Sequence, residues 1–126
     1  MTTPRVPIVA KRFQVIGGLP WAQSFRFKRP ILNEAGQKIG EEIEDVSAYT
    51  GWVADWRPEA RSAREVPLVV DSSLAAEGIV TVSADAEGTE DMDGAGVFDV
   101  LAELSGVPRG FVRAKTSWER VVTRDD

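Results

Sequence analysis

Apolar and polar residues alternate along much of this 126-residue chain, and this period of two constrains the fold more than any other feature. The alternation places Trp52, Ala54 and Trp56 on one face of a segment that ends at Pro58. A strand with one buried face has this pattern, because successive side chains point to opposite sides of a sheet. The same pattern, or a short β-branched run, predicts strands at 21–28, 66–70, 79–83, 97–104 and 112–122, with 12–16 as a seventh candidate.

Segments rich in glycine or proline separate these runs, at 17–20, 33–36, 93–96 and 106–110. Only 58–65 and 72–77 are candidates for a turn or two of helix, with Gly78 as the stop of the second. We therefore expect an all-β fold: an antiparallel immunoglobulin-like β-sandwich of about seven strands over 19–126, preceded by an extended basic arm over 1–18. The expected core comprises Phe25, Phe27, Trp52, Trp56, Val80, Val82, Phe98, Val100 and Trp118.

Composition removes several classes of enzyme site. The chain has no Cys and no His, which excludes disulfides, thiolate nucleophiles, imidazole bases and ordinary zinc sites. The glycines at 94 and 96 lack the third glycine of a phosphate-binding loop. A Ser–Lys dyad that pairs Ser24 or Ser117 with Lys28 or Lys115 is possible on paper, but the sequence does not distinguish these residues from ordinary strand-face ones. We expect no enzymatic activity, no catalytic residues and no cofactor.

An acidic segment at 85–94 is the sharpest local feature. Its carboxylates precede Gly94 at alternate positions, as they do in Ca²⁺ loops. The EF-hand order fails, however, because a third ligand before the glycine and a terminal glutamate are both missing. We expect a solvated acidic loop and no metal site, and the sequence leaves open whether this loop binds a cation.

Charge is distributed unevenly along the chain. Residues 1–30 carry six basic residues and no acidic one, whereas residues 31–110 carry 17 acidic and 5 basic residues. Opposite potentials steer association, so we expect the basic arm to dock on a neighbouring subunit. The docking residues would be the cations Arg5, Lys11 and Arg12 and the apolar anchors Val6, Ile8, Val9 and Phe13. Arg26 and Lys28, in contrast, alternate with phenylalanines, and a solvated strand face explains them as well.

The overall charge and hydropathy limit which partners and which cellular compartment we expect for the protein. A net charge of −5 and a pI near 4.8 argue against general binding of nucleic acid. No stretch approaches the roughly 20 apolar residues that cross a bilayer, so we expect no membrane association and assembly in the cytoplasm.

The order of six short segments resembles the small β-sandwich domain of tailed-phage virion proteins. That domain opens upper-baseplate proteins and also stands alone as a short minor tail protein. The matching elements are an apolar strand at 24–30, a turn at 33–36, Thr50-Gly51-Trp52 entering a strand, the strand at 78–82, Phe98-Asp99-Val100, and a closing strand that ends Val122-Thr123-Arg124. The similarity runs from about Trp21 to Arg124, while 39–45 lengthens the hairpin before Thr50 and the first 20 residues have no counterpart.

This resemblance implies a non-enzymatic structural protein of the bacteriophage virion, a minor tail or baseplate adaptor assembled in the host cytoplasm. Its partners would be other virion proteins and copies of itself in a symmetric assembly. The alternatives are a capsid (head) decoration protein and a soluble immunoglobulin-like binding module.

Overall fold

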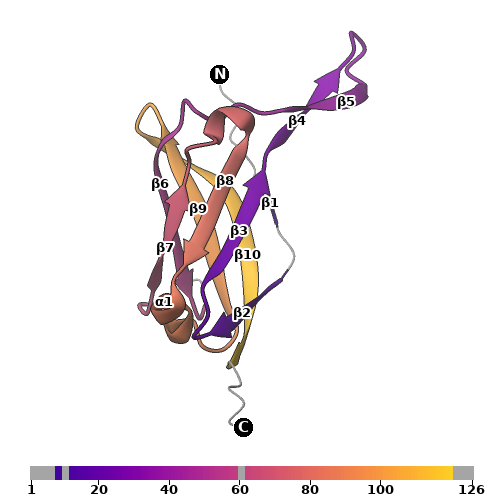
Figure 1. Cartoon of the computed structure of the whole chain (residues 1–126). Coiled ribbons are helices and arrows are strands. Elements are labelled where there is room, and N and C mark those ends of the chain that lie inside the picture. The colour runs from indigo at the N-terminus through magenta and orange to yellow at the C-terminus, as the bar shows by residue number, and fades with distance from the viewer. Residues whose placement is uncertain (1–7, 10–11, 60–61, 121–126) are drawn as a thin grey trace.

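The computed structural model describes residues 8–9, 12–59 and 62–120, and within them the chain is mostly β-structure (Figure 1). An all-β fold is therefore confirmed. The strands are β1 (Ile8–Val9), β2 (Phe13–Gly17), β3 (Trp21–Arg26), β4 (Lys28–Leu32), β5 (Lys38–Ile43), β6 (Thr50–Arg57), β7 (Val66–Asp71), β8 (Ile79–Ala84), β9 (Gly96–Leu104) and β10 (Val107–Arg120). A 3-10 turn (Ala75–Glu77) and one short helix, α1 (Ala86–Asp91), complete the described elements.

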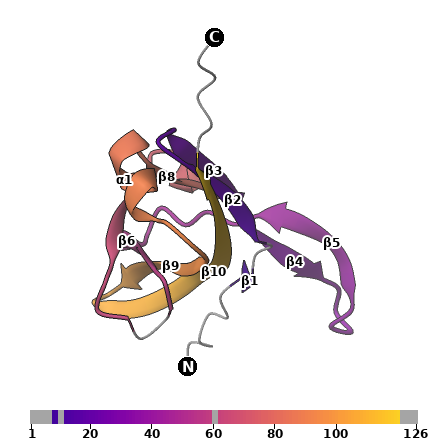
Figure 2. The same cartoon turned by 90° about the horizontal axis from the view of Figure 1, so that it is seen from below.

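Eight of these strands form one strongly curved sheet, in the order β1-β10-β9-β6-β7-β8-β3. The eighth, β2, pairs with β10 on the same edge as β1 and continues it. Both of these pairings are parallel, whereas every other pairing in the sheet is antiparallel. The curvature brings the two end strands of the sheet close together, and Figure 2 shows the nearly closed outline.

The gap between the end strands is filled by aromatic side chains. The ring of Phe13 in β2 lies 5.8 Å from that of Phe25 and 6.3 Å from that of Trp21, both in β3. Phe98 of β9 contacts the same three rings. Packing of rings in place of backbone hydrogen bonds thus closes this side of the sheet.

The predicted alternation governs which residues are buried. Along β10, Val112, Ala114 and Thr116 are buried while Arg113 and Lys115 are exposed. Of the expected core, Phe25, Phe27, Trp56, Val80, Val82, Phe98 and Val100 are buried, whereas Trp52 and Trp118 are only partly so. Of these two tryptophans, Trp52 lies near the start of β6 and Trp118 near the end of β10. Val122 lies outside the described residues.

The prediction for the turn ended by Gly78 is confirmed, whereas the prediction of a loop throughout 85–94 is wrong. Gly78 ends the 3-10 turn with a left-handed φ of 73°, as the sequence predicts. The acidic segment is not a loop throughout, because 86–91 forms α1 with Asp85 as its N-cap. The Asp85 carboxylate accepts a hydrogen bond of 2.7 Å from the amide of Gly88, which satisfies one of the free N–H groups at a helix start.

The strands β4 and β5 pair only with each other and form a separate two-stranded hairpin. In both Figure 1 and Figure 2 this hairpin projects from the side of the molecule where β3 and β10 lie, away from β6. Because the strand predicted at 21–28 is broken after Arg26, the chain leaves the sheet at Phe27 and returns to it at Thr50.

Candidate functional site

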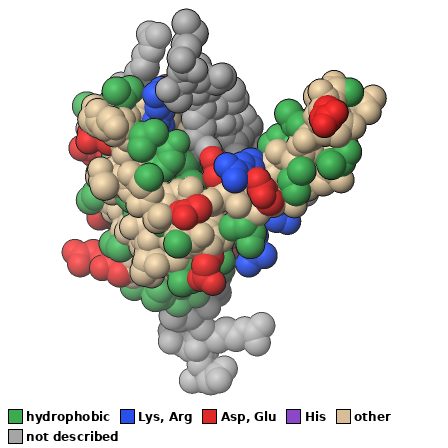
Figure 3. Space-filling view, turned by 90° about the horizontal axis from the view of Figure 1, so that it is seen from above, with side chains coloured by type: hydrophobic (Ala, Val, Ile, Leu, Met, Phe, Trp, Pro, Cys, Tyr) green, Lys and Arg blue, Asp and Glu red, His purple; other side chains and the backbone are tan. Residues whose placement is uncertain are grey.

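The projecting hairpin, residues 28–43, pairs with no other strand of the described chain. Nearly all of its side chains are exposed. Four of them are large and apolar: Ile31 (38% exposed), Leu32 (56%), Ile39 (66%) and Ile43 (52%). Figure 3 shows apolar side chains along the length of the projection. An isolated two-stranded hairpin is at best marginally stable in water, so local features have to hold this one in place.

The tip of the hairpin is fixed by Asn33. Its side-chain oxygen accepts hydrogen bonds from the amides of Ala35, at 3.0 Å, and Gln37, at 2.9 Å. Its backbone oxygen accepts from Gly36, which has a left-handed φ of 79°. Asparagine and glycine at these places are the residues expected of a tight turn, and the sequence signal at 33–36 is thereby confirmed.

The root of the hairpin is fixed to the body by backbone hydrogen bonds. The amide of Phe27 donates to the Gly78 oxygen at 2.7 Å, and that of Glu44 donates to the Phe27 oxygen at 3.0 Å. A side chain at Gly78 would come within 2.8 Å of the backbone oxygens of Phe27 and Glu44, so glycine is required there by space as well as by φ. The ring of Phe27 is buried 5.2 Å from that of Phe111. The direction of the hairpin is therefore set by a packed anchor.

Ion pairs cross and flank the hairpin. Arg29 lies directly opposite Glu42 and bonds to it at 2.6 Å, and Lys38 bonds to Glu41 at 2.6 Å. The hydrogen bond and the charge of Lys38, together with the more distant charge of Lys28, hold the pKa of Glu41 below its ordinary value. All of these groups are exposed, and exposed pairs contribute little to folding. Lys28 takes part in none of the ion pairs between described residues.

A second candidate surface is a hollow on the outer face of β6 and β9, and we call it the β6–β9 groove. Three cross-strand pairs line it: Val53 with Leu101, Asp55 with Asp99, and Arg57 with Val97. The hollow has a volume of about 230 Å³. Asp99 is bonded by Arg113 at 3.1 Å and Arg57 by Glu65 at 2.7 Å, whereas Asp55 has no ion-pair partner among the described residues. Like charges directly opposite each other are unfavourable, so Asp55, beside the already paired Asp99, favours a further cation.

A larger hollow of about 420 Å³ lies where β3, β7 and β8 meet the start of α1. Trp21, Pro67 and Val69 supply its apolar wall, and Asp85 lies at its rim. The Asp85 carboxylate is already used as the cap of α1. Ser83 is the other polar side chain in the lining, so the hollow offers a mostly apolar wall with few polar groups to orient a ligand.

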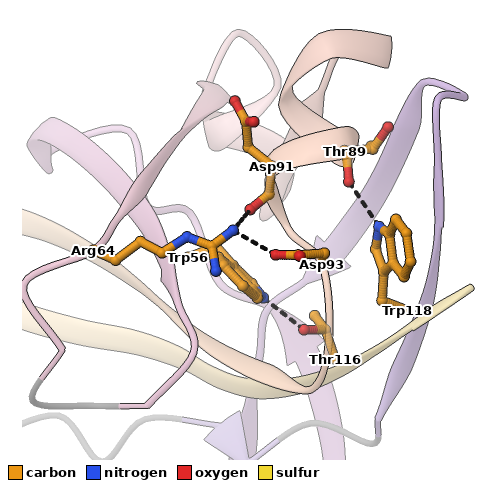
Figure 4. A network of polar contacts seen from close by, with 7 residues as sticks. All are labelled: Trp56, Arg64, Thr89, Asp91, Asp93, Thr116 and Trp118. Carbon is orange, nitrogen blue, oxygen red and sulfur yellow. Dashed lines mark hydrogen bonds and ion pairs between the residues drawn. The ribbon is translucent and has the colours of Figure 1, made fainter.

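A polar network braces the end of the body opposite the hairpin root (Figure 4). Arg64 bonds to the backbone oxygen of Asp91 and to the carboxylate of Asp93, both at 2.5 Å, and its guanidinium lies 5.6 Å from the centre of the Trp56 ring. The indole N–H of Trp56 donates to the Thr116 hydroxyl at 2.7 Å. The network therefore ties the loop before β7 and the loop after α1 to the core.

The same network accounts for much of the acidic segment. Asp85 caps a helix and Asp93 is neutralised by Arg64. Within the described ranges, no group of three or more acidic side chains is arranged to hold a metal ion. The Ser24 hydroxyl, one half of the conceivable dyad, is hydrogen-bonded to the hydroxyl of Thr81 at 2.8 Å.

The docking residues predicted in the arm are only partly within the described chain. Arg5, Val6 and Lys11 lie outside it, and Ile8 and Val9 form β1, whose backbone pairs with β10. Arg12 is exposed, while Phe13 is half-buried among the rings of Trp21, Phe25 and Phe98. Contact of these residues with another subunit stays a prediction.

The apolar residues of the hairpin are absent from that predicted set. The available signal was the extra segment at 39–45, which contains Ile39 and Ile43 among acidic residues and has no place in a sandwich strand. Comparison of the chain with models of protein families and with curated proteins finds no match. In the described part of the chain no helix is both long and apolar enough to span a bilayer.

Proposed function

We propose that this chain is a non-enzymatic structural protein of a bacteriophage virion, an adaptor of the tail or baseplate that docks on neighbouring subunits. The observation that carries the proposal is the projecting hairpin, because a rigidly anchored element with four exposed large apolar side chains gains stability only when another surface covers them. The resemblance of the sequence to phage virion domains supports a neighbouring tail or baseplate subunit as that surface.

We also propose an architecture for the body of the protein. We describe it as an immunoglobulin-like sandwich, with β2, β10, β9 and β6 in one layer and β3 and β8 in the other. The pairing of β7 with both β6 and β8 supports this description, since a strand shared between two layers connects them at a corner. Such a body holds docking elements at fixed distances from one another.

The basic arm is a second docking element in this proposal. The positive charge of the arm supports contact with an acidic surface. Within the arm, β1 and β2 pair with the edge of β10. A variant that lacks residues 2–11 keeps Val15, the first buried core residue of the described chain, and should therefore fold. It should fail to enter particles, and incorporation of the intact chain should weaken as salt screens the arm.

Mass spectrometry of purified particles tests the function itself. Particles of the phage that encodes the chain should contain it at a fixed ratio to the major tail protein, and gold-labelled antibody should mark the tail. Label spread over the capsid would replace the tail assignment with head decoration. Presence in infected lysate but absence from particles would overturn the virion role in favour of a soluble binding module.

A further inference from the structure

No segment within residues 8–9, 12–59 and 62–120 covers the apolar side chains of the hairpin. The hairpin is anchored at Phe27 and Glu44 and projects away from β6 in both ribbon views. Ile39, the most exposed of its apolar residues, and Ile43 therefore lie in solvent in the isolated chain. Because the described part of the chain supplies no cover, these side chains are available to a partner molecule.

The β6–β9 groove offers the complementary chemistry. Val53 is 51% exposed and Leu101 is 40% exposed, and the two lie directly opposite each other. The next pair along the same face is Asp55 with Asp99. The groove thus presents an apolar pair and, about 7 Å further along the strands, an acidic pair.

The hairpin presents the matching arrangement. Lys28 lies directly opposite Ile43, so that a cation and a large apolar group share one face at a spacing of about 5 Å. Lys28 on this face of the hairpin and Asp55 in the groove have no ion-pair partner among the described residues, and neither does Glu34, which lies at the hairpin tip. A contact that places Ile43 on the Val53–Leu101 pair brings Lys28 within reach of Asp55 and Asp99.

From this match we infer that the hairpin of one copy seats in the β6–β9 groove of a second copy. The contact joins two different surfaces, so each copy uses its hairpin on one neighbour and its groove on another. Such a head-to-tail contact forms a ring if its rotation closes and a filament if it does not. The inference deepens the proposed function, on which its place in a virion rests, because a ring of adaptors suits a tail with rotational symmetry.

Two single substitutions in the full chain test the contact. Ile39→Asp places a charge on the hairpin, and Asp55→Lys replaces the groove's acid with a cation that repels Lys28. Both positions are solvent-accessible, so circular dichroism should show the native fold. In sedimentation velocity over a series of concentrations, the intact chain should associate, and each variant alone should need at least a tenfold higher concentration to do so. Val107→Asp, an exposed position outside both surfaces, is the matched control and should associate like the intact chain.

A mixture of the two variants gives the sharpest result. The Asp55→Lys copy keeps a native hairpin and the Ile39→Asp copy keeps a native groove, so an equimolar mixture should form dimers that grow no further. Monomeric behaviour of the intact chain at every concentration would overturn the inference. So would association that survives both substitutions, or a mixture that stays monomeric.

Failure of this contact is distinguishable from failure of the proposed function. A chain that enters particles but never associates with itself would keep the virion role and lose the inference. A chain that associates as described but is absent from particles would keep the contact and lose the virion role.

Discussion

The curved sheet and the projecting hairpin are built from the same kind of strand but are stabilised in opposite ways. In the sheet, buried side chains such as Trp56 and Phe98 lie on the inner face and every strand has a neighbour. In the hairpin, all residues of β4 are exposed and the strands are joined by a tight turn and exposed ion pairs. The difference shows that strand pattern alone does not decide burial, since a strand is buried only where a second layer covers it.

The largest effect is expected in the sheet, for Trp56→Ala. The ring is fully buried, donates to Thr116, and packs so closely on Gly96 that a side chain added there would collide with it. Its loss should lower the free energy of unfolding by about 3 to 5 kcal/mol. Urea unfolding followed by circular dichroism measures this, with Val53→Ala, an exposed position on the same strand, as the control. Equal stability of the two variants would contradict the central role of Trp56.

A smaller loss is expected for Thr89→Val, which changes a buried polar group without changing its shape much. The Thr89 hydroxyl accepts from the amide of Gly18 at 3.1 Å and donates to the backbone oxygen of Leu19 at 2.8 Å, and thus ties α1 to the turn between β2 and β3. Without it two partly buried backbone groups lose a partner, at a cost of about 1 to 2 kcal/mol. Thr50→Val, at an exposed position, should leave the urea midpoint unchanged. A loss no larger than that of the control would show that these groups find water instead.

The hairpin should tolerate substitution far better, and Arg29→Ala tests that side of the comparison. The bond from Arg29 to Glu42 is short but exposed, so its removal should change the free energy of unfolding by about 1 kcal/mol or less. The measurement is the same urea titration. A loss as large as that of Trp56→Ala would mean that the hairpin supports the body, and the contrast between the two regions would fail.

The smallest effects concern two exposed carboxylates, Asp45 in the segment before β6 and Asp71 at the end of β7. Hydrogen bonds from the hydroxyl and then the amide of Ser47 lower the pKa of Asp45, and those of Ser73 likewise lower the pKa of Asp71. A lowered pKa in the folded state means that each group contributes its small stabilisation above its unfolded pKa and loses it as the pH falls through its folded pKa. Carbon NMR titration should show both midpoints below the ordinary aspartate value and a rise toward it in Ser47→Ala and Ser73→Ala. Midpoints unchanged by these substitutions would assign the shifts to another cause.

The sequence by itself determined most strands of the body, though not β1 or the break after Arg26, together with the turn at 33–36 and the stop at Gly78, because each of these depends on residues that are neighbours in the chain. Alternation decides which face of β10 is apolar, and a left-handed φ at Gly78 is a local demand. The short helix at 86–91 was not predicted, although its signal is also local. That signal is Asp85, which caps the helix but was interpreted only as a candidate cation ligand.

Only the tertiary structure decided which strands are covered. The parallel pairing of β1 and β2 with β10 joins residues about a hundred positions apart, and no local pattern specifies such a partner. Ile31 and Ile43 are exposed because the chain leaves the sheet at Phe27 and is held outside it. The groove likewise exists only where β6 and β9 place Asp55 beside Asp99. Burial and juxtaposition depend on distant segments that pack against each other, and for that physical reason the candidate docking surfaces came from the fold and not from the sequence.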